Sequence, residues 1–181
     1  MREAITWPAV IEGVDIWQSE FAGGDSWPIL RRVLGHYLDR APEASELERG
    51  EHGKPRLREP RGIEFSLSHS RGLAVVAVAA RAVGVDVEAI VPRRGRPAEF
   101  YEEWVRREAT VKCLGVGLLS DLPDRPVAVE GFDAGPGYAA AVALAGHAVG
   151  PVRARTLSAR SGRCGGRGDG GRSLPPDHRA R

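Results

Sequence analysis

Two segments of the chain repeat hydrophobic residues at the three- and four-residue spacing of an amphipathic helix. The first covers residues 29–38, where Asp25 or Ser26 can provide the N-terminal cap. The second covers residues 100–114, and Gly115 directly after it is typical of a helix end. We therefore predict one helix in the first quarter of the chain and one past its midpoint.

Shorter stretches carry the alternation or the continuous hydrophobicity of β-strands. Alternation over residues 63–67 predicts a half-buried strand that ends in the polar stretch 68–72. Residues 73–80 form a continuous apolar run of strand length, which a buried helix would also fit. Residues 41–62 are polar and rich in turn formers, so they are predicted as a loop. Further strands are predicted at 13–18, 83–88, 127–132 and 138–144, the last two as a hairpin.

Composition narrows the class of protein. Of the 181 residues, 42% are hydrophobic and 28% charged, which suits an ordinary globular core and excludes a fibrous or wholly disordered chain. The apolar runs at 73–80 and 138–145 are too short to cross a bilayer, and residues 1–11 lack the features of a signal peptide. Cys113 and Cys164 are too few for a disulfide framework or a cysteine metal site. We expect a cytoplasmic protein that does not contact membranes.

Positive charge is concentrated at the C-terminal end. From Arg153 onward the chain has eight arginines against two aspartates, which leaves residues 1–152 with a net charge of −4. A mildly acidic body does not favour nucleic-acid binding. Because the residues beyond Gly150 are mostly Gly, Arg, Ser and Pro, we predict that residues 151–181 form a disordered tail.

Two carboxylates lie one residue apart on the strand predicted at 83–88. At this spacing Asp86 and Glu88 point to the same face of a sheet. Carboxylates this close repel each other unless a cation or a basic side chain lies between them. The alternative is an ordinary solvent-facing strand side, which also alternates apolar and polar residues.

Trp104, Glu108 and Lys112 recur every four residues and form one stripe on the helix predicted at 100–114. A Glu–Lys pair at this spacing often does no more than stabilise an exposed helix. However, 24 of the 26 basic residues are arginine, and the two lysines are Lys54 and Lys112. In a chain so biased toward arginine, a lysine indicates a position that needs a compact point charge rather than a planar fork.

Two further positions are candidates for contact with an anion. Lys54 lies between a glycine and a proline, in a turn that can direct it toward a ligand or simply into solvent. His69 lies between two serines at a predicted strand end, where an imidazole can donate to a phosphate or be an ordinary surface residue. A Ser-His-Asp hydrolase triad is excluded, because adjacent Ser and His cannot readily act on each other as nucleophile and base, and no nucleophile elbow is present.

The order of these motifs is more specific than any one of them. A Gly-Lys-Pro turn at 53–55 is followed by Phe-Ser-Leu-Ser-His-Ser at 65–70, Gly-Val-Asp-Val-Glu at 84–88 and Trp-Val-Arg-Arg-Glu-Ala-Thr-Val-Lys at 104–112. This succession resembles the 4′-phosphopantetheinyl transferases of the surfactin-type subfamily, in a shortened form. The resemblance covers about residues 31–145.

The resemblance implies an α+β fold with pseudo-two-fold symmetry, in which the active site lies between two similar halves. In this chain the halves would be residues 1–78 and 79–150. The implied reaction transfers 4′-phosphopantetheine from coenzyme A to a serine hydroxyl of an apo acyl or peptidyl carrier protein, with release of adenosine 3′,5′-bisphosphate. Mg²⁺ is the implied cofactor, and a monomer is the expected state.

Site residues follow from the same resemblance. Asp86, Glu88 and Glu108 correspond to the magnesium ligands, and their hard oxygen donors suit Mg²⁺. Lys112 corresponds to the lysine that contacts the pyrophosphate. Glu108, or a water that it orients, corresponds to the base for the carrier serine. The positions that correspond to contacts with coenzyme A phosphates or adenosine are Lys54, Ser68 and His69.

Three departures from the family leave alternatives open. Fifteen residues separate Glu88 from Trp104, where the family has a longer segment that includes part of its carrier-docking surface. Residues 92–101, with their three arginines, would have to replace it. The basic residues before the family's first helix have no clear match, and the arginine-rich tail is not a family feature. A non-catalytic relative that binds coenzyme A or a carrier protein, or more remotely a Mg²⁺-dependent phosphohydrolase, would also fit.

Overall fold

The structure is a computed structural model that describes residues 12–59, 61–91, 96–117 and 121–158. Within these ranges the chain forms two α-helices, one short 3₁₀ helix and nine strands. In chain order they are β1 (Val14–Glu20), α1 (Trp27–Leu34), the 3₁₀ helix (Ala44–Glu46), β2 (Leu47–Arg49), β3 (Pro55–Leu57), β4 (Glu64–Ser70), β5 (Leu73–Ala79), β6 (Val83–Ala89), α2 (Ala98–Leu114), β7 (Val127–Gly131), β8 (Tyr138–Ala145) and β9 (Val152–Thr156).

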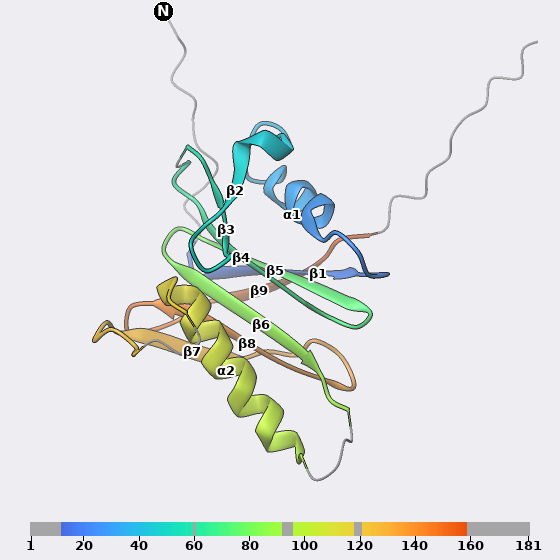
Figure 1. Cartoon of the computed structure of the whole chain (residues 1–181), viewed down its shortest axis with the longest axis vertical. Coiled ribbons are helices and arrows are strands. Elements are labelled where there is room, and N and C mark those ends of the chain that lie inside the picture. The colour runs from blue at the N-terminus through green and yellow to red at the C-terminus, as the bar shows by residue number, and fades with distance from the viewer. Residues whose placement is uncertain (1–11, 60, 92–95, 118–120, 159–181) are drawn as a thin grey trace, which may run out of the picture.

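The fold is mixed α+β, and its two larger sheets form the centre of the molecule. The first sheet has the strand order β4-β5-β1-β9, with β1 antiparallel to β5 and parallel to β9. The second has the order β6-β8-β7 and is antiparallel throughout. The outer strands β4 and β6 belong to different sheets, yet they lie side by side, because β4 side chains accept hydrogen bonds from the β6 backbone (Figure 1).

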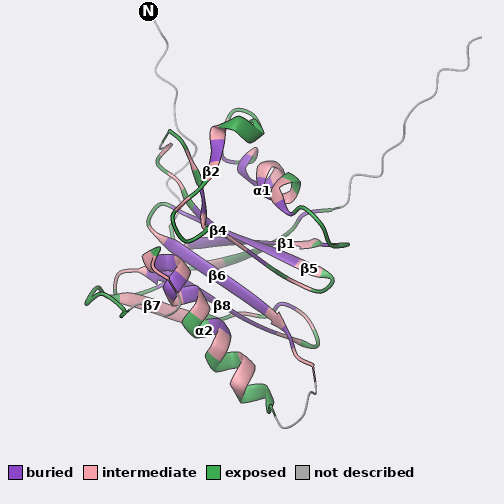
Figure 2. Cartoon of the chain, viewed as in Figure 1, coloured by how far each residue is buried: buried purple, intermediate pink, exposed green. Residues whose placement is uncertain are grey.

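The helices and sheets stack in four layers. Apolar side chains from the facing sides of the two sheets, such as Ile16 and Val85, form the central core. α1 packs on the other face of the first sheet, where Leu30 lies in one cluster with Trp17. α2 packs on the other face of the second sheet through residues that include Val105. β6 is buried along nearly its whole length between α2 and the central core (Figure 2).

The crossing of α2 over β6 determines which β6 side chains face the helix. A Cβ atom at Gly84 would lie 2.0 Å from the carbonyl oxygen of Ala109, so this close approach requires glycine. Asp86 and Glu88 follow Gly84 on the same face of the strand. The carboxylates of β6 are therefore on the α2 side, while its valines fill the central core.

Several predicted elements are confirmed. The apolar run at 73–80 is a strand, β5, and not a buried helix. The segments at 127–132 and 138–144 form the hairpin β7-β8. The second helix begins two residues earlier than predicted and ends at Leu114, as predicted. Gly115 caps it with a φ of 69°, the left-handed conformation that glycine adopts without strain.

Three predictions at the N-terminal end were wrong in extent. β4 continues to Ser70 instead of ending at residue 67, because it pairs with β5 through the polar positions as well. α1 ends at Leu34, and the chain then turns so that the Tyr37 side chain packs in the same apolar cluster as α1. The predicted loop at 41–62 contains the 3₁₀ helix and the hairpin β2-β3.

The predicted disordered tail was wrong at its start. β9 pairs with β1, and the Arg153 guanidinium lies 2.5 Å from a carboxylate oxygen of Asp15. Backbone pairing and this ion pair order a segment that has few apolar residues. Residues 159–181, and residues 92–95 of the predicted docking loop, lie outside the described ranges. The division into halves at residue 78 stays a prediction. No helix in the described ranges is long and apolar enough to span a membrane.

Candidate functional site

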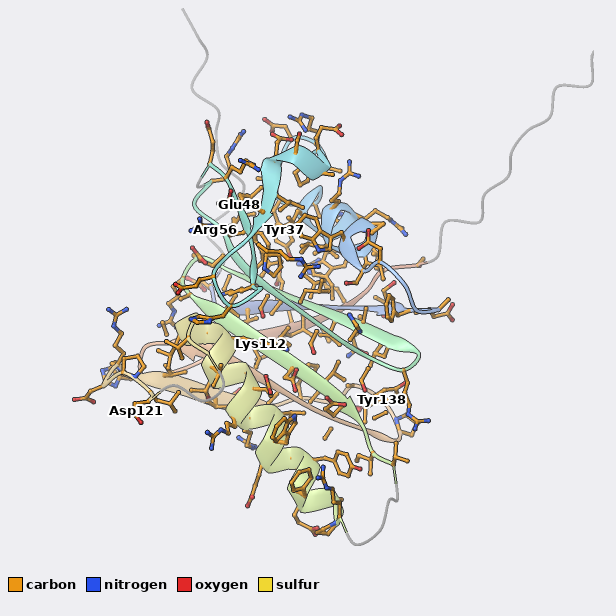
Figure 3. All side chains as sticks on the ribbon, in the orientation of Figure 1. Tyr37, Glu48, Arg56, Lys112, Asp121 and Tyr138 are labelled. Carbon is orange, nitrogen blue, oxygen red and sulfur yellow. The ribbon has the colours of Figure 1, made fainter. Side chains whose placement is uncertain are left out.

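One pocket, with a volume of about 690 Å³, collects the residues that the motifs singled out. Its walls come from β4, β6, α2 and the turn before β3. Figure 3 labels Lys112 in the C-terminal part of α2, beside β6. The predicted site residues that line it are Lys54, Ser68, His69, Asp86, Glu88, Glu108 and Lys112, and Trp104 lies among them.

Asp86 is buried in the pocket wall, with 4% of its surface exposed. Its Oδ1 accepts hydrogen bonds from Ser68 Oγ at 2.7 Å and from Lys112 Nζ at 2.6 Å. Its Oδ2 is also buried but has no hydrogen-bond partner among the described residues. A buried carboxylate oxygen without a partner is costly, so this atom favours a ligand that would bind it.

Lys112 bridges the two sheets at the same place. In addition to its ion pair with Asp86, its Nζ donates to Ser68 Oγ at 3.3 Å. An ammonium group has three donors, so these two contacts still allow a third to a ligand in the pocket. The planar fork of an arginine would not reproduce this arrangement, which gives a physical reason for lysine here.

The other two carboxylates lie in the same pocket in different settings. Glu88 is half-buried, and its Oε2 accepts a hydrogen bond from Ser70 Oγ at 2.9 Å. Burial raises the pKa of Glu108 above its ordinary value of 4.5, and the nearby charges of Asp86 and Glu88 raise it further against the opposing effect of Lys112. The three carboxylates thus influence one another electrostatically.

The carboxylates of this pocket suit a magnesium ion that is held partly by other ligands. Across the described residues, no three His, Cys, Asp or Glu side chains are grouped closely enough to hold a metal ion by themselves. Magnesium, however, is usually bound by one or two carboxylates together with waters and substrate phosphates, not by an all-protein cage. The unpartnered Oδ2 of Asp86, with Glu88 and Glu108 in the same pocket, is a hard-oxygen donor set that fits this mode.

Lys54 and His69 occupy more peripheral positions. Lys54 Nζ donates to the carbonyl oxygen of Val83 at 2.9 Å, and burial lowers the pKa of this lysine. Lys54 therefore supports the start of β6 as well as lining the pocket. His69 is exposed, and its ring packs on Phe21 with the ring centroids 4.5 Å apart.

Sequence reasoning missed the part of the pocket that the β2-β3 region contributes. Arg49, His52 and Trp27 line the same pocket, and the Arg49 guanidinium lies 5.2 Å from the centre of the Trp27 ring. These residues lie in the segment predicted as a loop and at the start of α1. The one signal for them was the adjacent Gly-Lys-Pro turn, which closes the β2-β3 hairpin.

Comparisons with known proteins find relatives that match about half of the chain. No family model matches the chain. The chain is 31% identical to the 4′-phosphopantetheinyl transferase HetI of Nostoc sp. (strain PCC 7120) over 118 residues, in a match that covers 50% of this chain and 50% of HetI. It is 26% identical over 120 residues, 51% of this chain and 49% of the relative, to a Synechocystis sp. (strain PCC 6803) protein named "Putative 4'-phosphopantetheinyl transferase slr0495". The chain spans about half the length of the curated relatives it matches. Over about half of its length, the chain is thus similar to proteins named as 4′-phosphopantetheinyl transferases.

Proposed function

We propose that this protein transfers the 4′-phosphopantetheine group of coenzyme A to a serine hydroxyl of an apo acyl or peptidyl carrier protein, in a Mg²⁺-dependent reaction. The observation that carries the proposal is that Asp86, whose buried Oδ2 has no partner among the described residues, lines a pocket together with Glu88, Glu108 and Lys112. The motif order further favours a shortened member of the surfactin-type subfamily, with the site between two pseudo-symmetric halves.

Asp86, Glu88 and Glu108 are the residues that would hold the ion. A bound Mg²⁺ would neutralise the charge of the coenzyme A pyrophosphate. Two of these carboxylates come from β6 and one from α2, so the donor set exists only when the helix packs on the sheet. Gly84 permits that packing because it has no side chain. It therefore helps to assemble the site without contacting a ligand through a side chain.

Lys112 would stabilise negative charge on the pyrophosphate. Its hydrogen bonds to Asp86 and Ser68 orient the ammonium group before substrate binds, so little reorganisation accompanies the reaction. Ser68 thereby acts on the site through Lys112 and Asp86. Lys54, His69 and the newly found Arg49 and His52 add positive or hydrogen-bonding groups around the rest of the pocket, which suit the phosphates of coenzyme A.

Glu108 is the proposed base. The serine oxygen would bond to the β-phosphorus of coenzyme A as the bond from that phosphorus to the bridging oxygen breaks, and adenosine 3′,5′-bisphosphate leaves with the bond's electrons. The serine proton passes to Glu108 directly or through a water. Burial raises the pKa of Glu108 in the metal-free chain, and a Mg²⁺ bound to this carboxylate would oppose that shift.

A non-catalytic relative that binds coenzyme A or a carrier protein is the second candidate. One observation favours it: the carboxylates are not grouped around one point among the described residues. Such a protein would retain binding in this pocket without transfer.

Intact-mass spectrometry of an apo carrier protein incubated with the full chain, coenzyme A and Mg²⁺ tests the proposal. We expect a mass gain of one phosphopantetheine group that EDTA abolishes. Glu108→Gln should slow transfer by about 100-fold, as expected for loss of a general base. The matched control Glu103→Gln removes an exposed carboxylate from the same helix and should not slow it. Binding of coenzyme A without mass gain on fatty-acid, polyketide or peptide carriers would instead support the non-catalytic candidate.

A further inference from the structure

The seam between β4 and β6 is made by side chains. Ser66, Ser68 and Ser70 alternate along β4, and their Oγ atoms accept hydrogen bonds from the backbone N–H groups of Val85 at 3.1 Å, Val87 at 3.4 Å and Ala89 at 3.0 Å. Both strands have a period of two, so the three bonds repeat in register. Serine hydroxyls thus take the place that the carbonyl oxygens of a neighbouring strand would have.

The three serines are not equivalent. A backbone N–H can only donate, so each of these hydroxyls uses a lone pair as acceptor and keeps its proton for another partner. Ser68 donates that proton to Asp86, and Ser70 donates it to Glu88 Oε2 at 2.9 Å. Ser66 makes the same bond to the backbone but donates to no carboxylate among the described residues.

The bond from Ser70 constrains a flexible side chain. A half-buried glutamate has three rotatable side-chain bonds, and a single orientation is favoured only when a partner holds its carboxylate. Ser70 Oγ is itself fixed by the Ala89 N–H, so the direction of its proton toward Glu88 is fixed as well. Residues that hold metal-binding carboxylates in this way commonly determine metal affinity.

We propose that Ser70 is a positioning residue that orients the Glu88 carboxylate for the divalent cation. This inference rests on the proposed function, because Glu88 is a ligand only if the pocket binds the ion. The sequence pattern gave Ser70 no role, because the strand was expected to end in the polar stretch 68–72. It is the extension of β4 to Ser70 that brings this hydroxyl to β6.

Binding of Mn²⁺ to the full chain, measured by the electron paramagnetic resonance signal of free Mn²⁺, tests the inference without any turnover. Ser70→Ala should weaken Mn²⁺ binding by about tenfold. Ser70→Thr keeps a hydroxyl and should restore most of the affinity. Ser66→Ala, the matched control, loses a backbone bond of the same kind and should stay within about twofold of wild type, since it removes no contact to a carboxylate. Thermal unfolding in EDTA checks that all three variants fold.

Three results would overturn the inference: equal Mn²⁺ affinity in wild type and Ser70→Ala, equal losses in Ser66→Ala and Ser70→Ala, or no Mn²⁺ binding by the wild-type chain. Failure of the proposed function is separate, because it appears as the absence of mass gain on carrier proteins. A wild-type chain that modifies a carrier while Ser70→Ala binds Mn²⁺ normally would leave the function standing and remove the role of Ser70.

Discussion

Asp15 and Asp86 are two buried aspartates with almost the same exposure, 3% and 4%, on strands of different sheets. Asp15 lies on β1, and both of its oxygens are used. Tyr37 donates to Oδ2 at 2.6 Å, and the Arg153 guanidinium lies 2.5 Å from Oδ1. Burial, with the hydrogen bond to Asp15, raises the pKa of Tyr37, so this phenol remains a donor at any physiological pH.

Asp86 has a similar pair of partners but only one occupied oxygen. A hydroxyl and a cation, from Ser68 and Lys112, both bind Oδ1, while Oδ2 has no partner among the described residues. Asp15 therefore completes a structural network that ties the last strand to the first sheet. Asp86 lines the pocket and keeps one buried oxygen without a partner among the described residues. Burial and charge alone do not distinguish a structural aspartate from a functional one; the occupancy of the second oxygen does.

The same substitution at the two positions should separate these roles, and Asp86→Asn has the larger effect. The amide has nearly the shape of the carboxylate but cannot supply a charged oxygen to the ion. We expect phosphopantetheine transfer to fall by about 1,000-fold, or roughly 4 kcal/mol of transition-state stabilisation. The free energy of unfolding should change by less than about 1 kcal/mol, because the neutral amide no longer buries a charged oxygen that has no partner among the described residues, and this gain offsets the weaker bond to Lys112. Transfer rates and urea unfolding of the same preparation measure both, and an active Asp86→Asn protein would contradict the comparison.

Asp15→Asn should give the opposite pattern. The amide loses the ion pairs to the β9 arginines and leaves the buried Tyr37 hydroxyl with a weaker acceptor. We expect the free energy of unfolding to decrease by about 2–3 kcal/mol, with the transfer rate per folded molecule nearly unchanged. Urea unfolding measures the first and transfer at saturating coenzyme A the second. A stable Asp15→Asn protein with impaired transfer would mean that the first sheet communicates with the pocket, and the distinction between the two aspartates would fail.

The sequence indicated the Asp86 side of this comparison because its pattern is local. Asp86 and Glu88 are two residues apart on a strand, and Glu108 and Lys112 are four apart on a helix, so periodicity alone predicts that each pair shares a face. The scarcity of lysine among the 26 basic residues then drew attention to Lys112. Spacing within one element cannot predict that the strand face and the helix face lie against each other. That prediction depended on the order of the motifs along the chain.

The sequence did not indicate the Asp15 side, because its contacts join residues far apart in the chain. Asp15 pairs with Arg153 across 138 positions, and β9 is ordered by pairing with β1 in spite of its low apolar content. The β2-β3 hairpin was missed for a related reason. Its strands are three residues each, which is too short for an alternating pattern. The contributions of Arg49 and His52 to the pocket could therefore not be predicted.

The smallest predicted effect concerns Glu108 in metal-free protein and sharpens the contrast between a satisfied and an unsatisfied carboxylate. The pKa of Glu108 is raised in the folded chain, chiefly by burial. Between the unfolded and the folded pKa, the folded chain holds a proton that the unfolded chain has released. The contribution of this group to stability therefore falls as pH rises through that window and remains unfavourable above it.

Glutamine stays neutral and avoids this loss of stability. In EDTA, Glu108→Gln should thus unfold at a higher temperature than wild type at pH 7, and at the same temperature near pH 4, where both side chains are mostly uncharged. The measurement is thermal unfolding of wild type and Glu108→Gln across this pH range. Curves that coincide at every pH, or a variant less stable at neutral pH, would mean that Lys112 satisfies Glu108 as fully as Arg153 and Tyr37 satisfy Asp15.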